Sequence, residues 1–324
     1  MPFSPARRNS SPLPPDTRTT NSARPATCQA EGAAASFSRD RQRSPAAERR
    51  LMKKASYRRL IALLLLALVA GTARAGALSV GGTGSAAPIV RLLFEEFLKQ
   101  APDARLNQIA PPLGSGSAVK ALAAGRIDLA VIGRVLKPAE AAQVGQQFAL
   151  ATTAFVLASS DAPQSGGFTV DQLARIYEGQ LLTWPDGSPI RLILRARFES
   201  DTQVLREMSP AMAKAVDAAS LRPGMVTADN DLDTLRLLAR TPGSLGPTTV
   251  GLLTTSNTRL VVLPINGVAP SLANLKNGSY PWRKTLTVVL PQQPGELAER
   301  FATFLRSAAA SRLLQAYDHL PYGQ

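Results

Sequence analysis

Three short turns rich in glycine, serine and threonine carry the residues best suited to bind an anion: Thr83-Gly84-Ser85, Gly114-Ser115-Gly116-Ser117 and Ser200-Asp201-Thr202. In each turn a strand is predicted to end and a helix to begin. A helix start offers backbone N–H groups without intrahelical partners, and nearby hydroxyl groups add further donors. One such turn is commonly just a helix cap. Three at the carboxyl ends of strands predict an anion site, because open α/β sheets bind ligands in that crevice.

The residue composition excludes several kinds of active site. The chain of 324 residues contains one cysteine, Cys28, and one histidine, His319. Disulfide frameworks, cysteine-histidine zinc sites and Ser-His or Cys-His catalysis are therefore excluded, unless His319 itself served. We expect His319 at the surface or at a helix end. The alternating Asp229, Asp231 and Asp233 lack the glycine and distal glutamate of a calcium loop, which favours a solvated helix start.

The formal charge of +14 is concentrated near the N-terminus. Residues 1–51 carry nine arginines against four acids, and residues 52–75 carry five basic residues and no acid. Residues 76–324 keep a charge of only +4. A basic surface for nucleic acid is therefore not predicted.

Residues 52–75 have the pattern of a secretory signal peptide. Basic residues precede the apolar run 60–70, and Ala73 and Ala75 follow it, so we expect cleavage near Ala75 and a periplasmic protein. The apolar run is shorter than the roughly 20 residues that span a membrane. Residues 1–51, rich in Pro, Ser, Ala and Arg, predict either a disordered extension or an upstream segment that is not translated, with the start at Met52.

Strands and helices alternate along the rest of the chain, which predicts an α/β fold with parallel strands. The spacing predicts strands at 77–80, 106–110, 127–132, 151–159, 190–194, 246–253, 259–263 and 286–290. It predicts helices at 86–100, 115–124, 169–177, 202–208, 232–240, 297–305 and 311–317.

Several motifs, in order, resemble the PstS-like phosphate-binding proteins of ABC importers. They are Gly-Ser-Gly-Ser-Ala-Val-Lys at 114–120, Leu-Ala-Arg-Ile-Tyr-Glu-Gly at 173–179, Thr-Trp-Pro-Asp-Gly at 183–187 and Gly-Val-Ala-Pro at 267–270. The resemblance spans residues 78–318.

This resemblance implies a two-lobed periplasmic-binding-protein-like fold of type II, with two mixed sheets flanked by helices and a hinge between them. Lobe 1 would comprise residues 76–152 plus 258–324, and lobe 2 residues 153–257. Such a protein captures an oxyanion, here phosphate first, between its lobes and delivers it to an ABC transporter permease in the inner membrane. We expect a monomer without catalytic activity, metal or cofactor.

The resemblance also implies which residues contact the ligand. An arginine after the strand that begins at residue 190 would grip the oxygens in bidentate fashion; Arg195 and Arg197 both qualify, and a surface salt bridge is the alternative for either. The implied ligand residues are Thr83, Ser85, Ser115, Ser117, Arg195, Arg197, Ser200, Asp201 and Thr202.

Two segments depart from the family pattern, at three positions. The third turn has Glu199 and Asp201 where the family has glycines, and Gly133 stands where the family has an aspartate. A carboxylate acceptor lets a site require a proton on its ligand, which separates phosphate from sulfate. Asp201 either takes over that role from the other lobe or caps the helix that begins at Thr202. A third alternative is that the acids have abolished phosphate binding, which would leave a ligand-sensing or scaffold module.

Overall fold

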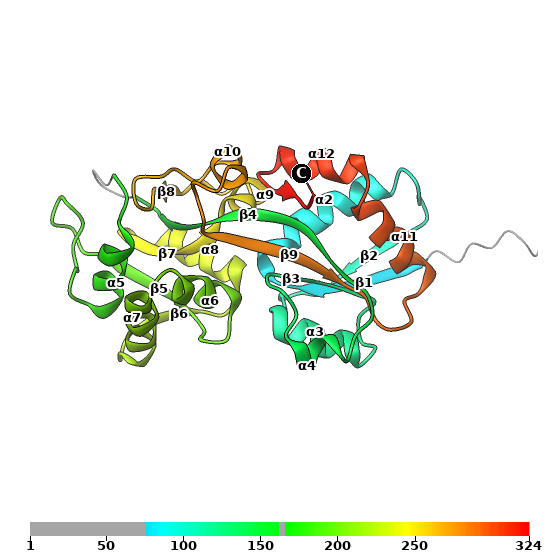
Figure 1. Ribbon diagram of the computed structural model, residues 1–324, viewed down its shortest axis with the longest axis horizontal. Coiled ribbons are helices and arrows are strands. Elements are labelled where there is room, and N and C mark those ends of the chain that lie inside the picture. The colour runs from blue at the N-terminus through cyan, green and yellow to red at the C-terminus, as the bar shows by residue number, and fades with distance from the viewer. Residues whose placement is uncertain (1–75, 162–165, 324) are drawn as a thin grey trace, which may run out of the picture. The chain divides into compact units, whose positions relative to one another are not determined.

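The computed structural model describes residues 76–161 and 166–323. The predicted signal peptide and the segment before it lie outside these residues. Within them, the strands form one mixed sheet in the order β2-β1-β3-β9-β4-β7-β5-β6, and β8 and β10 pair with β4 (Figure 1). The strands are β1 (Ala77–Gly82), β2 (Arg105–Gln108), β3 (Leu129–Ile132), β4 (Gln147–Ser159), β5 (Arg191–Arg195), β6 (Val226–Ala228), β7 (Ser244–Thr249), β8 (Val261–Leu263), β9 (Arg283–Val289) and β10 (Leu320–Pro321).

The long strand β4 joins two groups of parallel strands. Strand β1 pairs in parallel with β2 and β3, and β5 pairs in parallel with β6 and β7. Strand β4 runs antiparallel to β9 along its first part and to β7 and β8 along its second. We call β1–β3 with their helices the β1 half, and β5–β7 with theirs the β5 half. The α/β fold with mixed strands is as predicted, but β4 and β9 join the strands into one sheet, where the resemblance implied two.

Helices cover both faces of the sheet, and local signals set where they begin and end (Figure 1). The hydroxyl of Thr169 accepts from the N–H of Gln172, and Gly179 ends that helix in the left-handed conformation, as capping physics favours. The helices are η1 (Gly84–Ala86), α2 (Ala87–Phe97), α3 (Ser115–Ala123), α4 (Pro138–Ala141), α5 (Val170–Glu178), α6 (Ser200–Glu207), α7 (Pro210–Leu221), α8 (Asp231–Arg240), α9 (Val250–Thr255), α10 (Leu272–Lys276), α11 (Glu296–Leu305) and α12 (Ala308–Ala316).

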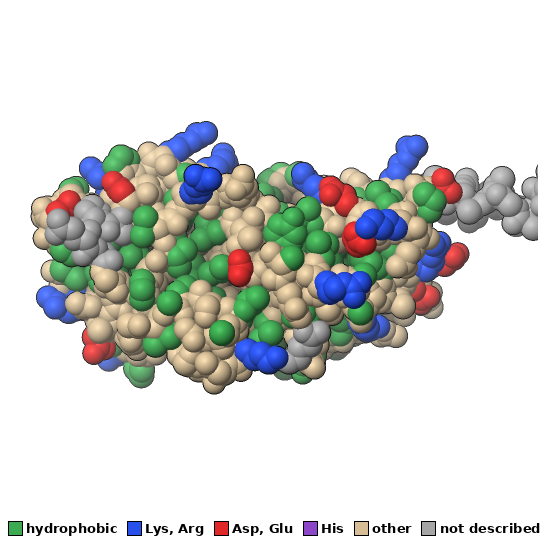
Figure 2. Space-filling view, turned by 90° about the horizontal axis from the view of Figure 1, so that it is seen from above, with side chains coloured by type: hydrophobic (Ala, Val, Ile, Leu, Met, Phe, Trp, Pro, Cys, Tyr) green, Lys and Arg blue, Asp and Glu red, His purple; other side chains and the backbone are tan. Residues whose placement is uncertain are grey.

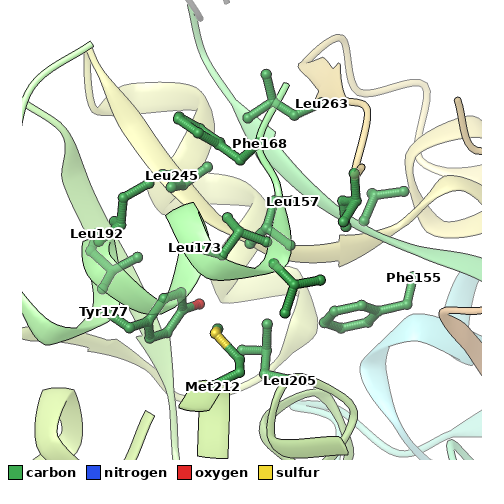
Figure 3. Packing of buried hydrophobic residues seen from close by; sticks show 14 of the residues in the cluster. Phe155, Leu157, Phe168, Leu173, Tyr177, Leu192, Leu205, Met212, Leu245 and Leu263 are labelled. Atoms are coloured by element: carbon green, nitrogen blue, oxygen red, sulfur yellow. The ribbon is translucent and has the colours of Figure 1, made fainter. Parts of the chain in front are cut away.

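Each half has its own apolar core. In the β1 half, Phe97 packs against Phe94, Phe301 and Phe304 with ring centroids 5.3 to 5.6 Å apart. In the β5 half, leucines of β4, β5 and β7 pack against Tyr177 and Met212 (Figure 3). The two halves thus bury their apolar side chains in separate clusters.

The lone histidine is buried, so its predicted place at the surface is wrong, whereas the alternative place at a helix end agrees with its position just after α12 (Ala308–Ala316). The chain after α12 turns back and pairs as β10 with β4, which covers the ring of His319 completely. Gly251 leaves room for that ring, since a Cβ there would collide with it. Burial lowers the pKa of His319 to about 4.

Charges are scattered on the face seen in Figure 2, where basic and acidic side chains alternate with polar and apolar ones. Within residues 76–161 and 166–323, none of the helices combines the length and the hydropathy needed to cross a bilayer.

Candidate anion site and its buried charge cluster

Five charged side chains meet between the β1 half and the β5 half, and we call them the charge cluster. Each side chain is between 1 and 9% exposed. Ionised groups this deeply buried are stable only when they are paired and hydrogen-bonded. The members are Arg195 at the end of β5, Glu199 just before α6, Asp201 in α6, Asp231 at the start of α8 and Lys284 in β9.

Lys284 binds both aspartates of the cluster. Its Nζ donates to Asp201 Oδ1 at 2.5 Å and to Asp231 Oδ1 at 2.7 Å. Lys284 lies on β9, the strand that links β3 and β4, whereas both aspartates lie in first turns of helices in the β5 half. The positive end of each helix dipole favours a carboxylate there.

Arg195 is the second cation of the cluster. Its Nη1 donates to the carbonyl of Ala228 at 2.9 Å, which fixes the plane of the guanidinium. Nη2 lies 3.3 Å from Glu199 Oε2 and 3.8 Å from Asp231 Oδ2, and Nε lies 3.7 Å from Asp201 Oδ2. Within the described chain, this Nε is buried and makes no hydrogen bond.

The β1 half contributes hydroxyl groups to the cluster. Thr83 Oγ1 donates to Asp231 Oδ2 at 3.1 Å and lies 3.1 Å from Ser85 Oγ. Ser115 Oγ accepts from the N–H of Gly133 at 3.0 Å. On the opposite side, Ser200 Oγ is buried and has no hydrogen-bond partner among the described residues. Both halves thus contribute donors to one small volume.

Three of the predicted ligand residues lie differently from what a ligand contact needs. Arg197 is largely exposed and pairs with Asp217 at 3.3 Å, which is the surface salt bridge considered as its alternative. Ser117 is exposed on α3. The hydroxyl of Thr202 donates to the carbonyls of Arg195 and Ala196 at 3.2 and 2.8 Å, so it closes the loop before α6.

Asp201 does not cap the helix in which it lies. The N-cap position of α6 is Glu199, which makes no side-chain capping bond, and the carboxylate of Asp201 binds Lys284 instead. The capping alternative is therefore wrong. Asp231 is buried at 5% exposure, which corrects the expectation of a solvated helix start for this residue, whereas Asp229 is exposed as expected.

Gly133 leaves the space that Lys284 fills. A Cβ at Gly133 would lie 2.5 Å from Lys284 Cε, 3.0 Å from Ser200 Oγ and 3.4 Å from Thr83 Oγ1. The position where the family pattern has an acidic acceptor thus faces a buried ammonium group.

The acids of the cluster differ in how easily they take up a proton. Burial raises the pKa of Asp231, but Lys284, Arg195 and the Thr83 hydroxyl outweigh it and hold the pKa well below the usual range. Burial raises the pKa of Asp201, and the charge of Asp231 adds to that rise. Burial also raises the pKa of Glu199. Asp231 is therefore the acid that stays ionised most firmly.

Lys284 was missed in the sequence, although its strand carries a signal. Lys284, Leu286 and Val288 share one face of β9 by the two-residue period of a strand, and all three are buried. Asp231 likewise shares a face of α8 with Leu235 and Leu238, and all three are buried.

The fold and the site together define a class of α/β ligand-binding proteins, with donors from two halves of one mixed sheet meeting at helix starts. Residues 69–309 match the family model of the PBP superfamily domain, and the chain belongs to that family. It is 26% identical over 241 residues to the phosphate-binding protein PstS of Bacillus subtilis (strain 168), covering 72% of this chain and 76% of that protein. The resemblance stated from the motifs is confirmed.

Solved structures share the fold. A putative phosphate ABC transporter substrate-binding protein with bound phosphate from Clostridium perfringens superposes with a TM-score of 0.65 at 18% identity, covering 76% of this chain and 99% of that one. An ABC-type phosphate transport receptor from Vibrio cholerae gives a TM-score of 0.56 at 18% identity, covering 75% and 99%. These relatives are named for binding and transport.

Proposed function

We propose that this chain is a periplasmic solute-binding protein that captures a small oxyanion, phosphate first, for an ABC importer. Its lobes would be residues 76–152 plus 258–324 and residues 153–257, with a permease of the inner membrane as partner. One observation carries the proposal: Thr83 of the β1 half and Arg195 and Ser200 of the β5 half meet in one buried cluster.

The unused donors of the cluster support an anion as ligand. The N–H at Arg195 Nε and the hydroxyl of Ser200 are buried without hydrogen bonds in the described part of the chain. Leaving such groups unpaired costs about 1–3 kcal/mol each. An oxyanion between the lobes would satisfy both, and closure about strands β4 and β9 would bring the β1 half onto it.

The acidic residues of the charge cluster favour a second candidate function. Asp201 and Asp231 already occupy Lys284 at 2.5 and 2.7 Å, and Gly133 has replaced the acceptor aspartate of the family pattern. These features suit a ligand-sensing or scaffold module of the same fold that has lost phosphate binding.

Calorimetry and thermal melting in phosphate, sulfate and molybdate test the two functions. A receptor raises its melting temperature with the oxyanion, because a ligand that binds only the folded state stabilises it. Arg195→Met should abolish that rise, and the matched exposed change Arg197→Met should leave it intact. A wild-type protein that responds to no oxyanion would favour the sensing or scaffold module.

Asp201→Asn tests the selectivity of the site. If Asp201 is the acceptor for a protonated phosphate, the amide variant should lose the preference of phosphate over sulfate in calorimetric titrations. An unchanged preference would remove Asp201 from that role.

A further inference from the structure

We propose that the carboxylate of Asp231, together with that of Asp201, permanently occupies the anion site, and we call Asp231 the resident anion. The protein therefore closes without a solute. This inference rests on the proposed function, because it takes the charge cluster to be the solute site. A solute oxyanion would bind only by displacing the Asp231 carboxylate from its donors.

The contacts of Asp231 are those of a bound anion. Its Oδ1 accepts from Lys284 at 2.7 Å, and its Oδ2 accepts from the Thr83 hydroxyl at 3.1 Å and lies 3.8 Å from Arg195 Nη2. Thr83 and Arg195 are two of the groups that the motifs predict for the solute. The carboxylate thus accepts a hydrogen bond from the β1 half and lies at ion-pair distance from a cation of the β5 half.

The second carboxylate completes the same arrangement. Asp201 lies 2.5 Å from Lys284 Nζ and 3.7 Å from Arg195 Nε, so both cations have an internal counter-charge. Glu199 adds a third acid at 3.3 Å from Arg195. With every group ionised, two cations face three carboxylates, and the cluster carries a net charge of −1.

The net negative charge of the cluster opposes the binding of a further anion. A phosphate dianion added to the closed cluster would bring its charge to −3 in a buried volume, where like charges are poorly screened. Removing the Asp231 carboxylate would instead make the cluster neutral, and Lys284, Arg195 and Thr83 would each lose one contact with an anion. The cavity left by Asp231→Ala is lined by Thr83, Arg195 and Lys284, and a small oxyanion or formate fits that chemistry.

The test is chemical rescue of Asp231→Ala. In chloride, Asp231→Ala should have a lower melting temperature than the wild-type protein. Formate or phosphate, each at about 100 times the Kd of that anion, should raise the melting temperature of the variant by about 5 °C or more. Its phosphate Kd should be at least about tenfold lower than that of the wild-type protein. Asp217→Ala, which removes a half-buried acid paired with Arg206 and Arg197 outside the charge cluster, should behave like the wild-type protein in every anion.

The scattering radius provides a second measurement. The wild-type protein should keep one radius with or without phosphate, whereas Asp231→Ala should expand in chloride and contract when formate is added. If Asp231→Ala is recovered only unfolded, its refolding yield in formate against chloride gives the same comparison. Asp231→Ala/Lys284→Met should lose the response to anions, because it lacks one of the two cations.

The outcomes separate this inference from the proposed function. Tight phosphate binding by the wild-type protein, weakened in Asp231→Ala, would overturn the resident anion and leave the receptor standing. Rescue of Asp231→Ala by formate and phosphate, without any binding of phosphate or sulfate to the wild-type protein, would support the resident anion and reject the phosphate receptor. A folded Asp231→Ala that responds to no anion would overturn the inference.

Discussion

Replacing Lys284 by methionine should strongly destabilise the folded protein. The methionine keeps the length and apolar character of the chain but removes the ammonium that binds Asp201 and Asp231 at 2.5 and 2.7 Å. Removing one partner of a buried ion pair costs about 3–5 kcal/mol, because the other charge stays buried without compensation. At about 2–4 °C per kcal/mol for a domain of this size, the melting temperature should fall by about 6–20 °C.

The stability lost in Lys284→Met should increase as the pH rises. Without Lys284, the two aspartates repel each other in a buried volume, and their folded-state pKa values rise above those of the unfolded chain. Carboxyl groups with raised pKa contribute stability below the unfolded pKa of about 3.9 and lose it as pH rises through the folded value. Lys284→Met should therefore differ from the wild-type protein more at pH 8 than at pH 5.

Urea denaturation at several pH values measures this effect, and a second variant separates charge from packing. Lys284→Met/Asp231→Asn removes one cation and one acid together, and replacing a buried ion pair by neutral groups is often close to neutral in stability. The double variant should regain part of the stability lost in Lys284→Met. Equal stability of Lys284→Met and the wild-type protein at pH 8 would refute the account of Lys284 as the central counter-charge.

Three further predictions concern other parts of the molecule. In urea titrations, the free energy of unfolding should fall by about 3 kcal/mol as the pH falls from 6.5, the unfolded pKa of His319, to about 4, its folded pKa. Only the unfolded ring takes up a proton in this range. His319→Gln should remove this part of the pH dependence. Phe301→Ala should cost about 3–5 kcal/mol in thermal unfolding, since the ring is fully buried among other phenylalanines; a loss below 1 kcal/mol would contradict the packing described. Thr83→Val should cost about 1–3 kcal/mol in urea at pH 7, because it removes the hydroxyl that donates to Asp231; an unchanged midpoint would count against that bond.

The sequence predicted those parts of the fold that depend on neighbouring residues. Helix starts such as that of α5 follow from a threonine cap and a glutamine three residues later, and apolar periodicity locates most strands. The turns at Thr83, Ser115 and Ser200 were found in the same way, and all three residues are buried.

The charge cluster could not be predicted in full because its contacts are long-range. Lys284 is 83 residues from Asp201 and 53 residues from Asp231, and no local pattern pairs a strand lysine with two helix starts. Arg195 and Arg197 are two residues apart and would share a face in an extended strand. Strand β5 ends at Arg195, which turns Arg197 away from the cluster.

Gly133 and Lys284 are sterically coupled, because a side chain at position 133 would compete with Lys284 for one space. A Cβ at Gly133 would lie 2.5 Å from Lys284 Cε, closer than side chains approach, so Gly133→Asp alone should force a shift and destabilise the fold by about 1–3 kcal/mol. Lys284→Ala would free the space and remove the cation that holds Asp201 and Asp231. In Gly133→Asp/Lys284→Ala, the steric loss should therefore disappear, but four carboxyl groups would face Arg195 alone. The double variant should then be most stable at low pH, where these acids are protonated. Melting curves of both single variants and the double variant at pH 5 and pH 8 measure the coupling between the two positions. If the losses in stability of the single variants add up to that of the double variant at both pH values, the two positions do not compete for one space.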